Sequence, residues 1–559
     1  MNHRNRNLLG LALLVLLALA VVAGLRLIPE RIEPCAEANH PAATYPDYSA
    51  TIIPPNVAPL NLKVLEGGRK FRLRFTAGAS APGEVFSTDG NMRIPPDVWR
   101  KLLEANAGGE LRLDIYVKGE KGWVHFDTAR NQIAAEEIDP YVVYRYIPPI
   151  YNKWDQISIR QRDLRNFNER IILDTQRSTD ADGRSVGGAC INCHTFLNHG
   201  TDQMLLHMRP SQRPQIPAMI LVRNGQAKKV DTRNGKNPPA AYTSWHPSGK
   251  LLAFSQNRII EMFHSAGVET RVVVDWDSDL SLYAVDTGRV YTVPQISRPD
   301  RLETFPSWSP DGQYLYFSSA PLPATDKKDV PLHYDKMQYD LERIAYDPAA
   351  DRWGQVETVV AAAQIGKSIS LPEISPDGRF LMFCGHDYGS FPVYQPSSDL
   401  YLLDLSRLVS PPVQSLPEGT GSAAASVKRD PTVLAIGKAF PRKLDEINSD
   451  RSDSYHSWSS NSRWVIFASK REDGMFARLY IAHLDADGRF SKPFVMPQQD
   501  PDFYSRCLMT YNRPELVRQP VTVTATELAR AMNSNASQVS GDAPPKPGAP
   551  EPAVQRQKH

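Results

Sequence analysis

A repeated pattern over residues 214–515 constrains the fold more than any other feature of the chain. Four stretches align, and each combines an apolar residue, a turn of the Pro-Asp-Gly type and a strand that ends in small residues. They are "YTSWHPSGKLLAFSQ" (242–256), "TFPSWSPDGQYLYFSSA" (304–320), "SLPEISPDGRFLMFCG" (370–385) and "SYHSWSSNSRWVIFASK" (454–470). A second pair of strand-like segments follows each stretch, so every unit holds four strands. Four-stranded units in series predict a β-propeller in which each unit is one blade.

The number of blades is predicted to be five or six. Four blades come from the aligned units. A fifth comes from "AMILVRNGQAKKVDT" (218–232), which is expected to close with C-terminal strand material near 503–511. A sixth follows if the insertion at 417–450 contains a blade.

The turns of these units resemble the TolB-like propeller repeat, whose hallmark is a Ser-Pro-Asp-Gly turn between two strands. The motif is complete at 309–312 and 375–378. In the first unit His246 and Ser248 replace Ser and Asp, and in the fourth unit "SSNS" (459–462) replaces the turn. The resemblance covers residues 214–515 and implies a closed propeller, often with an interaction role in the cell envelope. It implies no activity.

The first 30 residues predict an exported protein with a membrane anchor. Arg4 and Arg6 precede an apolar run from Leu8 to Leu25, whose 18 residues are just long enough to span a bilayer. The positive flank places the N-terminus in the cytoplasm and the bulk of the chain on the periplasmic side of a bacterial cytoplasmic membrane. The alternative is a cleaved signal peptide and a soluble periplasmic protein.

A small β-rich, sandwich-like domain is expected over residues 49–140, after a polar linker at 31–48. Segments such as "KFRLRFT" (70–76) alternate apolar and polar residues, as strands with one buried face do. "PPDVWRKLLEAN" (95–106) predicts a short helix with proline at its start. The net charge of +2 gives no sign of a nucleic-acid partner.

One Cys-x-x-Cys-His motif, formed by Cys190, Cys193 and His194, carries the chemistry of the chain. A structural zinc site usually takes its four ligands from two cysteine pairs, and a thioredoxin-like dithiol lies near a βαβ pattern; neither context is present. Covalent haem attachment needs two thiols for thioether bonds and a histidine next to the second thiol. The motif therefore predicts one haem c, with His194 as the proximal ligand of the iron.

The haem is expected in a short helical segment over residues 141–213, between the two β domains. The apolar residues of its first part fall on one helical face: Trp154, Ile157, Leu164, Phe167 and Ile171.

The distal ligand of the iron has several candidates in "NHGTDQMLLHMRP" (198–210). Met204 is the first choice, His207 the second and Met208 the third. Met204 and Met208 are four residues apart and would share one face of a helix. A methionine ligand raises the reduction potential of a haem, whereas a second histidine lowers it. A propeller histidine such as His246 or His456, or an open coordination position, are further alternatives.

The residues after the repeats, 516–559, are rich in Pro, Ala, Ser and Gln and are expected to be disordered. Cys384 and Cys507 are candidates for a disulfide, but spacing alone does not place two thiols within bonding distance.

Three functions fit these features. The first is a membrane-anchored, exported c-type cytochrome that passes electrons through one haem to a redox partner in the cell envelope, with the propeller as docking platform. The second is an envelope scaffold whose haem is structural or a sensor. The third is a haem oxidoreductase that acts on a small molecule at an open iron. A single haem motif favours an electron-transfer or haem-binding protein over a stand-alone enzyme, and fold does not decide among the three.

Overall fold

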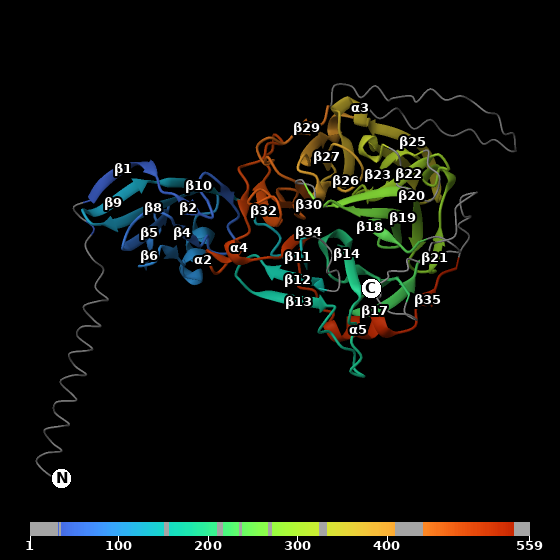
Figure 1. The fold of residues 1–559 in the computed structure, drawn as a ribbon, viewed down its shortest axis with the longest axis horizontal. Helices are drawn as coiled ribbons and strands as arrows, with labels where there is room; N and C mark the ends of the chain where they lie inside the picture. The colour runs from blue at the N-terminus through green and yellow to red at the C-terminus, as the bar shows by residue number, and fades with distance from the viewer. Residues whose placement is uncertain are drawn as a thin grey trace, which may run out of the picture.

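The computed structural model describes residue 32 and residues 35–149, 156–209, 216–233, 238–266, 271–323, 333–408 and 440–540. The chain is built mainly from strands, with a β-rich N-terminal domain beside a larger ring of sheets (Figure 1). The predicted anchor at residues 1–30 lies outside the described residues. Within the described ranges, no helix is long and apolar enough to cross a membrane.

The N-terminal domain contains two sheets. The larger has seven strands: β1 (Cys35–Pro41), β3 (Ile52–Ile53), β5 (Lys70–Ala77), β6 (Gly83–Ser87), β8 (Glu110–Gly119), β9 (Gly122–Asp127) and β10 (Ala129–Ile133). The smaller has three: β2 (Thr44–Tyr45), β4 (Leu62–Val64) and β7 (Asn91–Met92). The predicted helix is confirmed as α2 (Pro96–Ala105), which buries Trp99. The domain starts earlier than predicted, because β1 pairs with β9 inside the residues expected to be a linker.

Six further sheets form the blades of a propeller. Blade 1 consists of β34 (Thr510–Val517), β11 (Tyr141–Ile147), β12 (Ser158–Asp163) and β13 (Glu169–Asp174). Blade 2 consists of β14 (Cys190–Phe196), β15 (Gln203–Arg209), β16 (Ala218–Arg223), β17 (Gln226–Asp231) and the edge strand β35 (Ser537–Gln538). Blade 3 consists of β18 (Ala241–Trp245), β19 (Leu251–Phe263), β20 (Arg271–Ala284) and β21 (Arg289–Tyr291).

The other three blades follow in chain order. Blade 4 consists of β22 (Arg301–Trp308), β23 (Tyr314–Pro321), β24 (Asp340–Asp347) and β25 (Arg352–Val360). Blade 5 consists of β26 (Ser368–Ile374), β27 (Phe380–His386), β28 (Asp399–Asp404) and β29 (Arg442–Lys443). Blade 6 consists of β30 (Asp453–Trp458), β31 (Trp464–Ser469), β32 (Arg478–His483) and β33 (Phe494–Val495). Short helices in the connections are η2 (Leu197–His199), η3 (Pro294–Ile296), η4 (Tyr334–Lys336), α3 (Ala362–Ile365), η5 (Pro392–Tyr394), η6 (Leu405–Arg407) and α4 (Phe503–Arg506).

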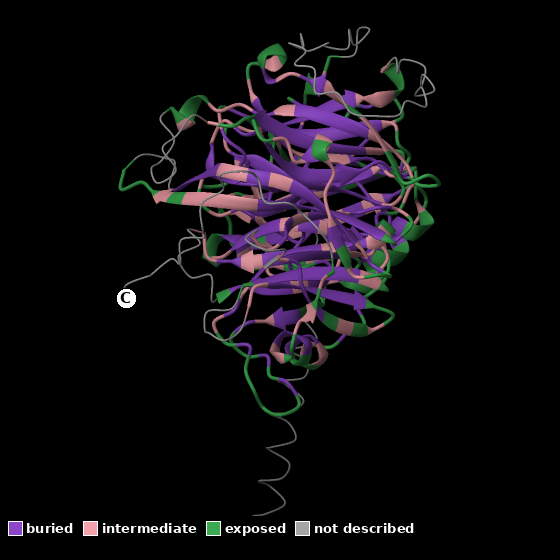
Figure 2. Cartoon of the chain, turned by 90° about the vertical axis from the view of Figure 1, so that its right-hand side faces the viewer, coloured by how far each residue is buried: buried purple, intermediate pink, exposed green. Residues whose placement is uncertain are grey.

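Strands from distant parts of the chain close the ring. The innermost strands contact one another in the order β34, β14, β18, β22, β26, β30 and back to β34. β34 pairs with β11 from Val517 opposite Tyr141 to Thr510 opposite Ile147, so blade 1 joins the two ends of the propeller. The prediction of a closed propeller is confirmed with six blades. Residues 141–209 supply strands of blades 1 and 2, and residues 218–231 belong to blade 2. Most of the insertion at 417–450, residues 417–439, lies outside the described residues. Buried residues fill the strands of the blades, and exposed residues lie mostly in the connections (Figure 2).

The helix predicted within residues 141–213 is wrong for the described part of that segment, which forms β11 to β15. The helical pattern was misleading because β12 buries polar side chains. Gln161 and Arg162 are each only 4% exposed, and Arg162 donates from Nη2 to the Pro497 carbonyl at 3.0 Å. A buried arginine removes the apolar–polar alternation by which a strand is recognised in a sequence.

The Ser-Pro-Asp-Gly turns join the innermost strand of a blade to its second strand. In blade 4 the Ser309 hydroxyl donates to Asp311 at 2.5 Å and accepts from the backbone N–H of Tyr314 at 2.9 Å. Gly312 has φ +71°, a conformation that is free of strain only without a Cβ. Blade 5 makes the same bonds within residues 375–380. The turn is therefore a local hydrogen-bonded unit.

In blade 3, His246 occupies the position of the serine in this turn. Its Nδ1 accepts from the Ser248 hydroxyl at 2.7 Å, and its Nε2 donates to the carbonyl of Gly312 at 3.2 Å. His246 therefore links the turns of blades 3 and 4.

The segment after the repeats is partly structured, which corrects the prediction of disorder from residue 516. β34 extends to Val517, and α5 (Ala525–Asn533) begins with a capping box between Thr524 and Glu527. Leu528 and Met532 of α5 are buried in one apolar cluster with strands of blades 1 and 2. Residues 541–559 lie outside the described residues.

Candidate functional site

The innermost strand of every blade contains a β-bulge at the same level of the ring. Strand pairing is interrupted at Cys193 in β14, at 242 in β18, at 305–306 in β22, at 371–372 in β26, at 455–456 in β30 and at 513–514 in β34. A bulge turns its extra residue out of the regular alternation. The six bulge residues, which we call the bulge ring, are Cys193, Tyr242, Phe305, Leu371, Tyr455 and Arg513.

The bulge ring is held by aromatic and cationic contacts across the central channel. The rings of Tyr242 and Phe305 have centroids 4.5 Å apart. The guanidinium of Arg513 lies 5.9 Å from the ring of Tyr242 and 5.6 Å from that of Tyr455. Tyr242, Phe305, Leu371, Tyr455 and Arg513 all have φ between 38° and 53°. Non-glycine residues in this region are strained, and such strain is concentrated at functional sites.

The Cys-x-x-Cys-His motif lies on β14, next to the channel. Cys190 is opposite Arg209 in the register with β15, and residues directly opposite each other share a face of the sheet. Cys193 is the bulge residue and lines a small cavity together with His207 and Tyr242. Since His207 and Arg209 alternate by two along β15, both thiols lie on their face of the sheet. His194 is opposite Leu206 and lies on the other face.

Positive charges surround the thiol of Cys193. Burial raises the pKa of this thiol, but the charge of Arg513 and a hydrogen bond with His207, with further contributions from the charges of His207 and Arg145, outweigh burial and bring the pKa to about 5. A thiol with such a pKa is a thiolate at neutral pH, and the thiolate is the nucleophilic form of cysteine. Cys193 is therefore the thiol of the pair with the lower pKa, since burial raises the pKa of Cys190.

His194 contacts the backbone of the neighbouring blade through one ring nitrogen. Its Nε2 donates to the carbonyl of Val143 on β11 at 3.3 Å, and its Nδ1 is buried without a hydrogen-bond partner. Burial, and then the charge of Arg513, lower the pKa of His194 to about 3, so the ring is neutral at physiological pH. A neutral imidazole with one anchored N–H and one unused lone pair is the form that binds a metal.

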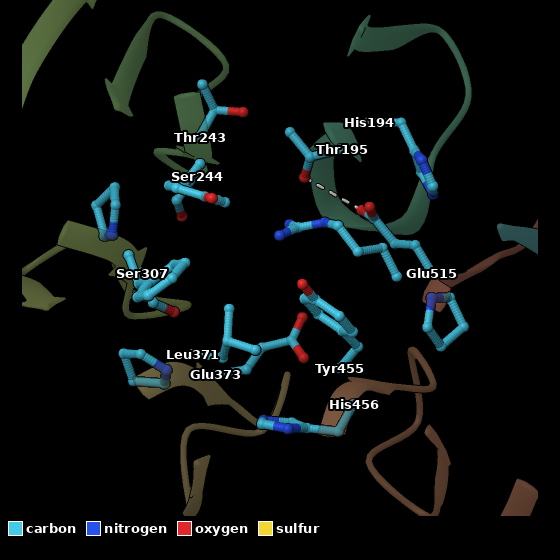
Figure 3. Close-up of a pocket in the computed structure, with 16 residues that line it drawn as sticks. His194, Thr195, Thr243, Ser244, Ser307, Leu371, Glu373, Tyr455, His456 and Glu515 are labelled. Atoms are coloured by element: carbon cyan, nitrogen blue, oxygen red, sulfur yellow. Dashed lines mark hydrogen bonds between the residues drawn. The ribbon is translucent and has the colours of Figure 1, made fainter. Parts of the chain in front are cut away.

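A cavity of about 130 Å³ lies at the centre of the propeller, beside the bulge ring (Figure 3). Each innermost strand contributes residues that follow its bulge, and these include His194, Thr195, Thr243, Ser244, Ser307, Glu373, His456 and Glu515. The lining mixes hydroxyls, imidazoles and carboxyls with apolar side chains such as Phe305, Leu371 and Pro372.

Two carboxyl groups face this cavity, Glu373 from β26 and Glu515 from β34 (Figure 3). Burial raises the pKa of both to about 8, and the charge of Arg513 acts against the shift in each. Glu515 accepts from the backbone N–H of Phe196 at 2.7 Å and from the hydroxyl of Thr195 at 3.2 Å. Glu373 has one buried oxygen, Oε2, without a partner. Both groups are mainly protonated at neutral pH and can act as hydrogen-bond donors.

The three distal-ligand candidates lie on two faces of β15. Met204 and Met208 share a face, as predicted, but because of strand periodicity rather than helical periodicity. They are 0% and 2% exposed and pack in the apolar cluster between blades 1 and 2. His207 lies on the face of the two thiols. The structure thus brings His207 next to Cys193, and Met208, but not Met204, also lines the small cavity that these two residues share.

Cys384 and Cys507 do not form a disulfide; both are buried thiols. Cys384 lies in β27, while Cys507 follows α4 and contacts the hydroxyl of Tyr146 at 3.4 Å.

Sequence reasoning missed Arg513, Tyr242 and Tyr455 as neighbours of the motif. The repeat itself held the signal, because "CHTFLNHG" (193–200) aligns with "YTSWHPSG" (242–249). In this alignment Cys193 matches Tyr242, and both are bulge residues. Recognition of the motif as one more innermost strand would have predicted its place in the ring.

The residue types are those that attach a haem covalently, but their arrangement does not fit one in this fold. The two thiols lie on one face of β14, whereas His194 lies on the other face. The cavity that His194 lines is smaller than the roughly 300 Å³ at which pockets for drug-sized ligands begin. Because a haem is at least as large as such ligands, its attachment requires the residues around β14 to move apart. Among the described residues, no three His, Cys, Asp or Glu side chains are grouped to hold a metal ion.

Comparisons with known proteins identify no family. No family model matches the chain, and no curated protein matches it. Similar solved structures include TolB from Acinetobacter baumannii, at 13% identity and a TM-score of 0.37, with 73% of this chain and 79% of that chain covered. Hydrazine synthase from Kuenenia stuttgartiensis is similar at 10% identity and a TM-score of 0.31, with 68% of this chain and 93% of that chain covered. Prolyl oligopeptidase B from Galerina marginata is similar at 10% identity and a TM-score of 0.33, over 63% of this chain and 44% of that chain. These values assign neither a family nor an activity, and the propeller is established by its own six sheets.

Proposed function

We propose that the protein is an exported c-type cytochrome, anchored to the bacterial cytoplasmic membrane, which transfers electrons through one covalently bound haem. The observation that carries the proposal is the Cys-x-x-Cys-His motif on the innermost strand of blade 2. Support comes from the two thiols on one face of that strand and from the neutral imidazole of His194 with its unpartnered Nδ1. The propeller would serve as the platform on which a redox partner of the cell envelope docks.

Cys190 and Cys193 would hold the haem as thioethers. The bound haem would supply a one-electron couple between ferric and ferrous iron. His194 would be the proximal ligand. His207, which lies on the face of the thiols, is the distal candidate with most structural support, ahead of Met204 and Met208.

Expression of the full chain with a working haem-maturation apparatus tests this proposal. The wild-type protein is expected to show a c-type absorption spectrum after denaturation, with one haem per chain. Cys190→Ser with Cys193→Ser is expected to abolish covalent haem, whereas the matched double variant Cys384→Ser with Cys507→Ser retains it. A wild-type protein without covalent haem would contradict the proposal.

A haem oxidoreductase is a second candidate function, favoured by the polar cavity beside His194. A cavity of about 130 Å³ lined by hydroxyls and two carboxyls suits a small polar substrate. Carbon monoxide separates the two functions. If carbon monoxide leaves the spectrum of the reduced protein unchanged, the iron has no free coordination position, which supports electron transfer. If the spectrum changes, the iron binds the gas, which supports an enzyme or a sensor. An envelope scaffold with no redox role would show no electron exchange with any soluble donor.

A further inference from the structure

Three prolines make the central cavity poor in fixed hydrogen-bond donors. Pro306, Pro372 and Pro514 each follow a bulge residue, in β22, β26 and β34, and all three line the cavity. Proline has no backbone N–H, and proteins commonly bind anions through successive backbone N–H groups. At three of the six innermost strands, the lining therefore lacks the donors that an anion would use.

Unused acceptors, by contrast, are present in the same lining. Both hydrogen bonds that Glu515 accepts from its neighbours end on Oε1, so neither involves its Oε2. Oε2 of Glu373 is buried without a partner among the described residues. Thr243 is 9% exposed, and its hydroxyl, which faces the cavity, also has no partner there (Figure 3). A buried polar atom without a hydrogen bond is costly, so these oxygens indicate a ligand that donates hydrogen bonds.

The cavity also lacks the positive charge that two carboxylates would require. Arg513 is the only residue of the described lining with a permanent positive charge, and one guanidinium cannot neutralise two carboxylates. Its charge also acts on Cys193, whose thiol pKa is raised by burial but brought to about 5 with the help of Arg513. His194 and His456 are neutral, because burial lowers their pKa to about 3 and about 4. The two carboxyls therefore keep their protons in the free protein.

An apolar surface lies beside these polar groups. Phe305 and Leu371, the bulge residues of blades 4 and 5, line the same cavity. Its volume of about 130 Å³ is well below the roughly 300 Å³ at which pockets for drug-sized ligands begin. A ligand that matches this lining is therefore small and combines a charged hydrogen-bond donor with a short apolar body.

We propose that the central cavity binds a small aliphatic primary amine as its ammonium ion, between Glu373 and Glu515. A primary ammonium has three N–H donors and no acceptor, which matches the unpartnered carboxyl and hydroxyl oxygens. Its short carbon chain packs against Phe305 and Leu371. On binding, a carboxyl beside the ammonium ionises and releases its proton to solvent, so that the charges balance inside the cavity. The site uses neither thiol of the Cys-x-x-Cys-His motif, and the inference does not depend on the proposed haem attachment.

Isothermal titration of the full-length protein, purified after haem maturation, with butylamine tests the inference. 1-Butanol and butyrate are the matched neutral and anionic probes. Butylamine is expected to bind at least about tenfold more tightly than either, because only the ammonium makes charge-assisted hydrogen bonds to carboxylates.

Proton release gives a second readout of the same titration. In buffers that differ in ionisation enthalpy, about one proton per bound amine is expected to be released at pH 7. The titratable and charged groups around the cavity are Glu373, Glu515, His194, His456, Arg513, Tyr242, Tyr455 and Cys193. Of these, the two carboxyls alone have a pKa near neutrality, about 8 for each because of burial.

Glu373→Gln and Glu515→Gln locate the site. Glutamine has the shape of the protonated carboxyl of the free protein, so both variants are expected to fold. Each is expected to weaken butylamine binding at least about tenfold and to reduce the proton release, because one charge-assisted contact is lost. Glu120→Gln, whose side chain is 86% exposed in the N-terminal domain, is the control and should match the wild type.

Each result decides the inference. If butylamine binds both variants as tightly as the wild type, the amine lies elsewhere, for example on the haem iron, and the inference is overturned. Equal or tighter binding of butyrate or 1-butanol, or no binding of butylamine in the millimolar range, overturns it as well. If neither variant folds, the comparison of the three probes on the wild type carries the test. Protein without covalent haem would contradict the proposed function, whereas titration of that same protein would still decide this inference.

Discussion

Blades 4 and 5 and blades 1 and 2 have the same topology but are built from very different sequences. Blades 4 and 5 carry complete Ser-Pro-Asp-Gly turns, whose serine and aspartate bonds are formed within six residues of chain. In blade 2 the corresponding connection is η2 and Gly200, and blade 1 obtains its innermost strand from residues 510–517. The strands of blades 1 and 2 therefore depend on partners far away in the sequence.

The comparison shows which blades supply the charged and reactive side chains of the bulge ring. In blades 4 and 5 the bulge ring receives Phe305 and Leu371, two apolar residues. In blades 1 and 2 it receives Arg513 and Cys193, a cation and a thiol. The blades with the most regular sequence thus form the scaffold, and the least regular blades provide the reactive groups.

The largest expected effect comes from a pair of glycine substitutions in the two regular blades. Gly312 and Gly378 occupy the same turn position, with φ +71° and +74°. A Cβ on Gly312 would lie 2.4 Å from Nε2 of His246, whereas a Cβ on Gly378 would meet no atom within 4 Å. Gly378→Ala is expected to cost about 1–2 kcal/mol, from the left-handed backbone alone. Gly312→Ala is expected to cost about 1–3 kcal/mol more, from the added clash.

Urea denaturation of both variants measures this difference. Equal destabilisation by the two substitutions would contradict the contact between the turns of blades 3 and 4.

A smaller effect on the free energy of unfolding is expected from the carboxyl of Glu373, which lies in blade 5 and lines the central cavity. Its pKa is about 8 in the folded protein, against an ordinary value of 4.5. The folded state keeps a proton that the unfolded state releases, so the stabilisation is complete below about pH 4.5 and is lost as the pH rises through 8. Relative to Glu373→Gln, the wild type is expected to lose more than about 1.4 kcal/mol between pH 5 and pH 8, the equivalent of one pKa unit.

Denaturation curves of wild type and Glu373→Gln at pH 5 and pH 8 provide the measurement, with Glu120→Gln as an exposed control. If the stability of the wild type relative to Glu373→Gln does not change between pH 5 and pH 8, this carboxyl is already ionised at pH 5. That result would contradict its raised pKa.

The smallest effect is expected from matched methionines in the second strands of blades 2 and 5. Met204 and Met382 are both 0% exposed in apolar clusters. Met→Leu at either position is expected to cost less than about 1.5 kcal/mol of stability, because the volume is conserved.

Met204→Leu is also expected to leave the spectrum of the haem-loaded protein unchanged, whereas His207→Leu alters it. Loss of a near-infrared methionine–iron band in Met204→Leu would restore Met204 as the distal ligand.

The regular blades were predictable from the sequence, and the site was predictable in part. Pro-Asp-Gly turns and alternating strands encode blades 3 to 6 locally, so they could be located from residues 242–495. Blades 1 and 2 could not, because Gln161 and Arg162 of β12 form hydrogen bonds with residues such as Gln519 and Pro497, more than 300 residues away. The pattern Cys190, Cys193, His194 was visible, but its neighbours Arg513, Tyr242 and Tyr455 reach it only through closure of the ring.

Peptide mass spectrometry of the matured protein tests the central claim most directly. After proteolysis, the peptide that contains residues 187–196 is expected to carry the mass of one porphyrin with its iron, bound through both sulfurs of the motif. Recovery of that peptide with two unmodified thiols, from cells that mature other c-type cytochromes, would contradict the account.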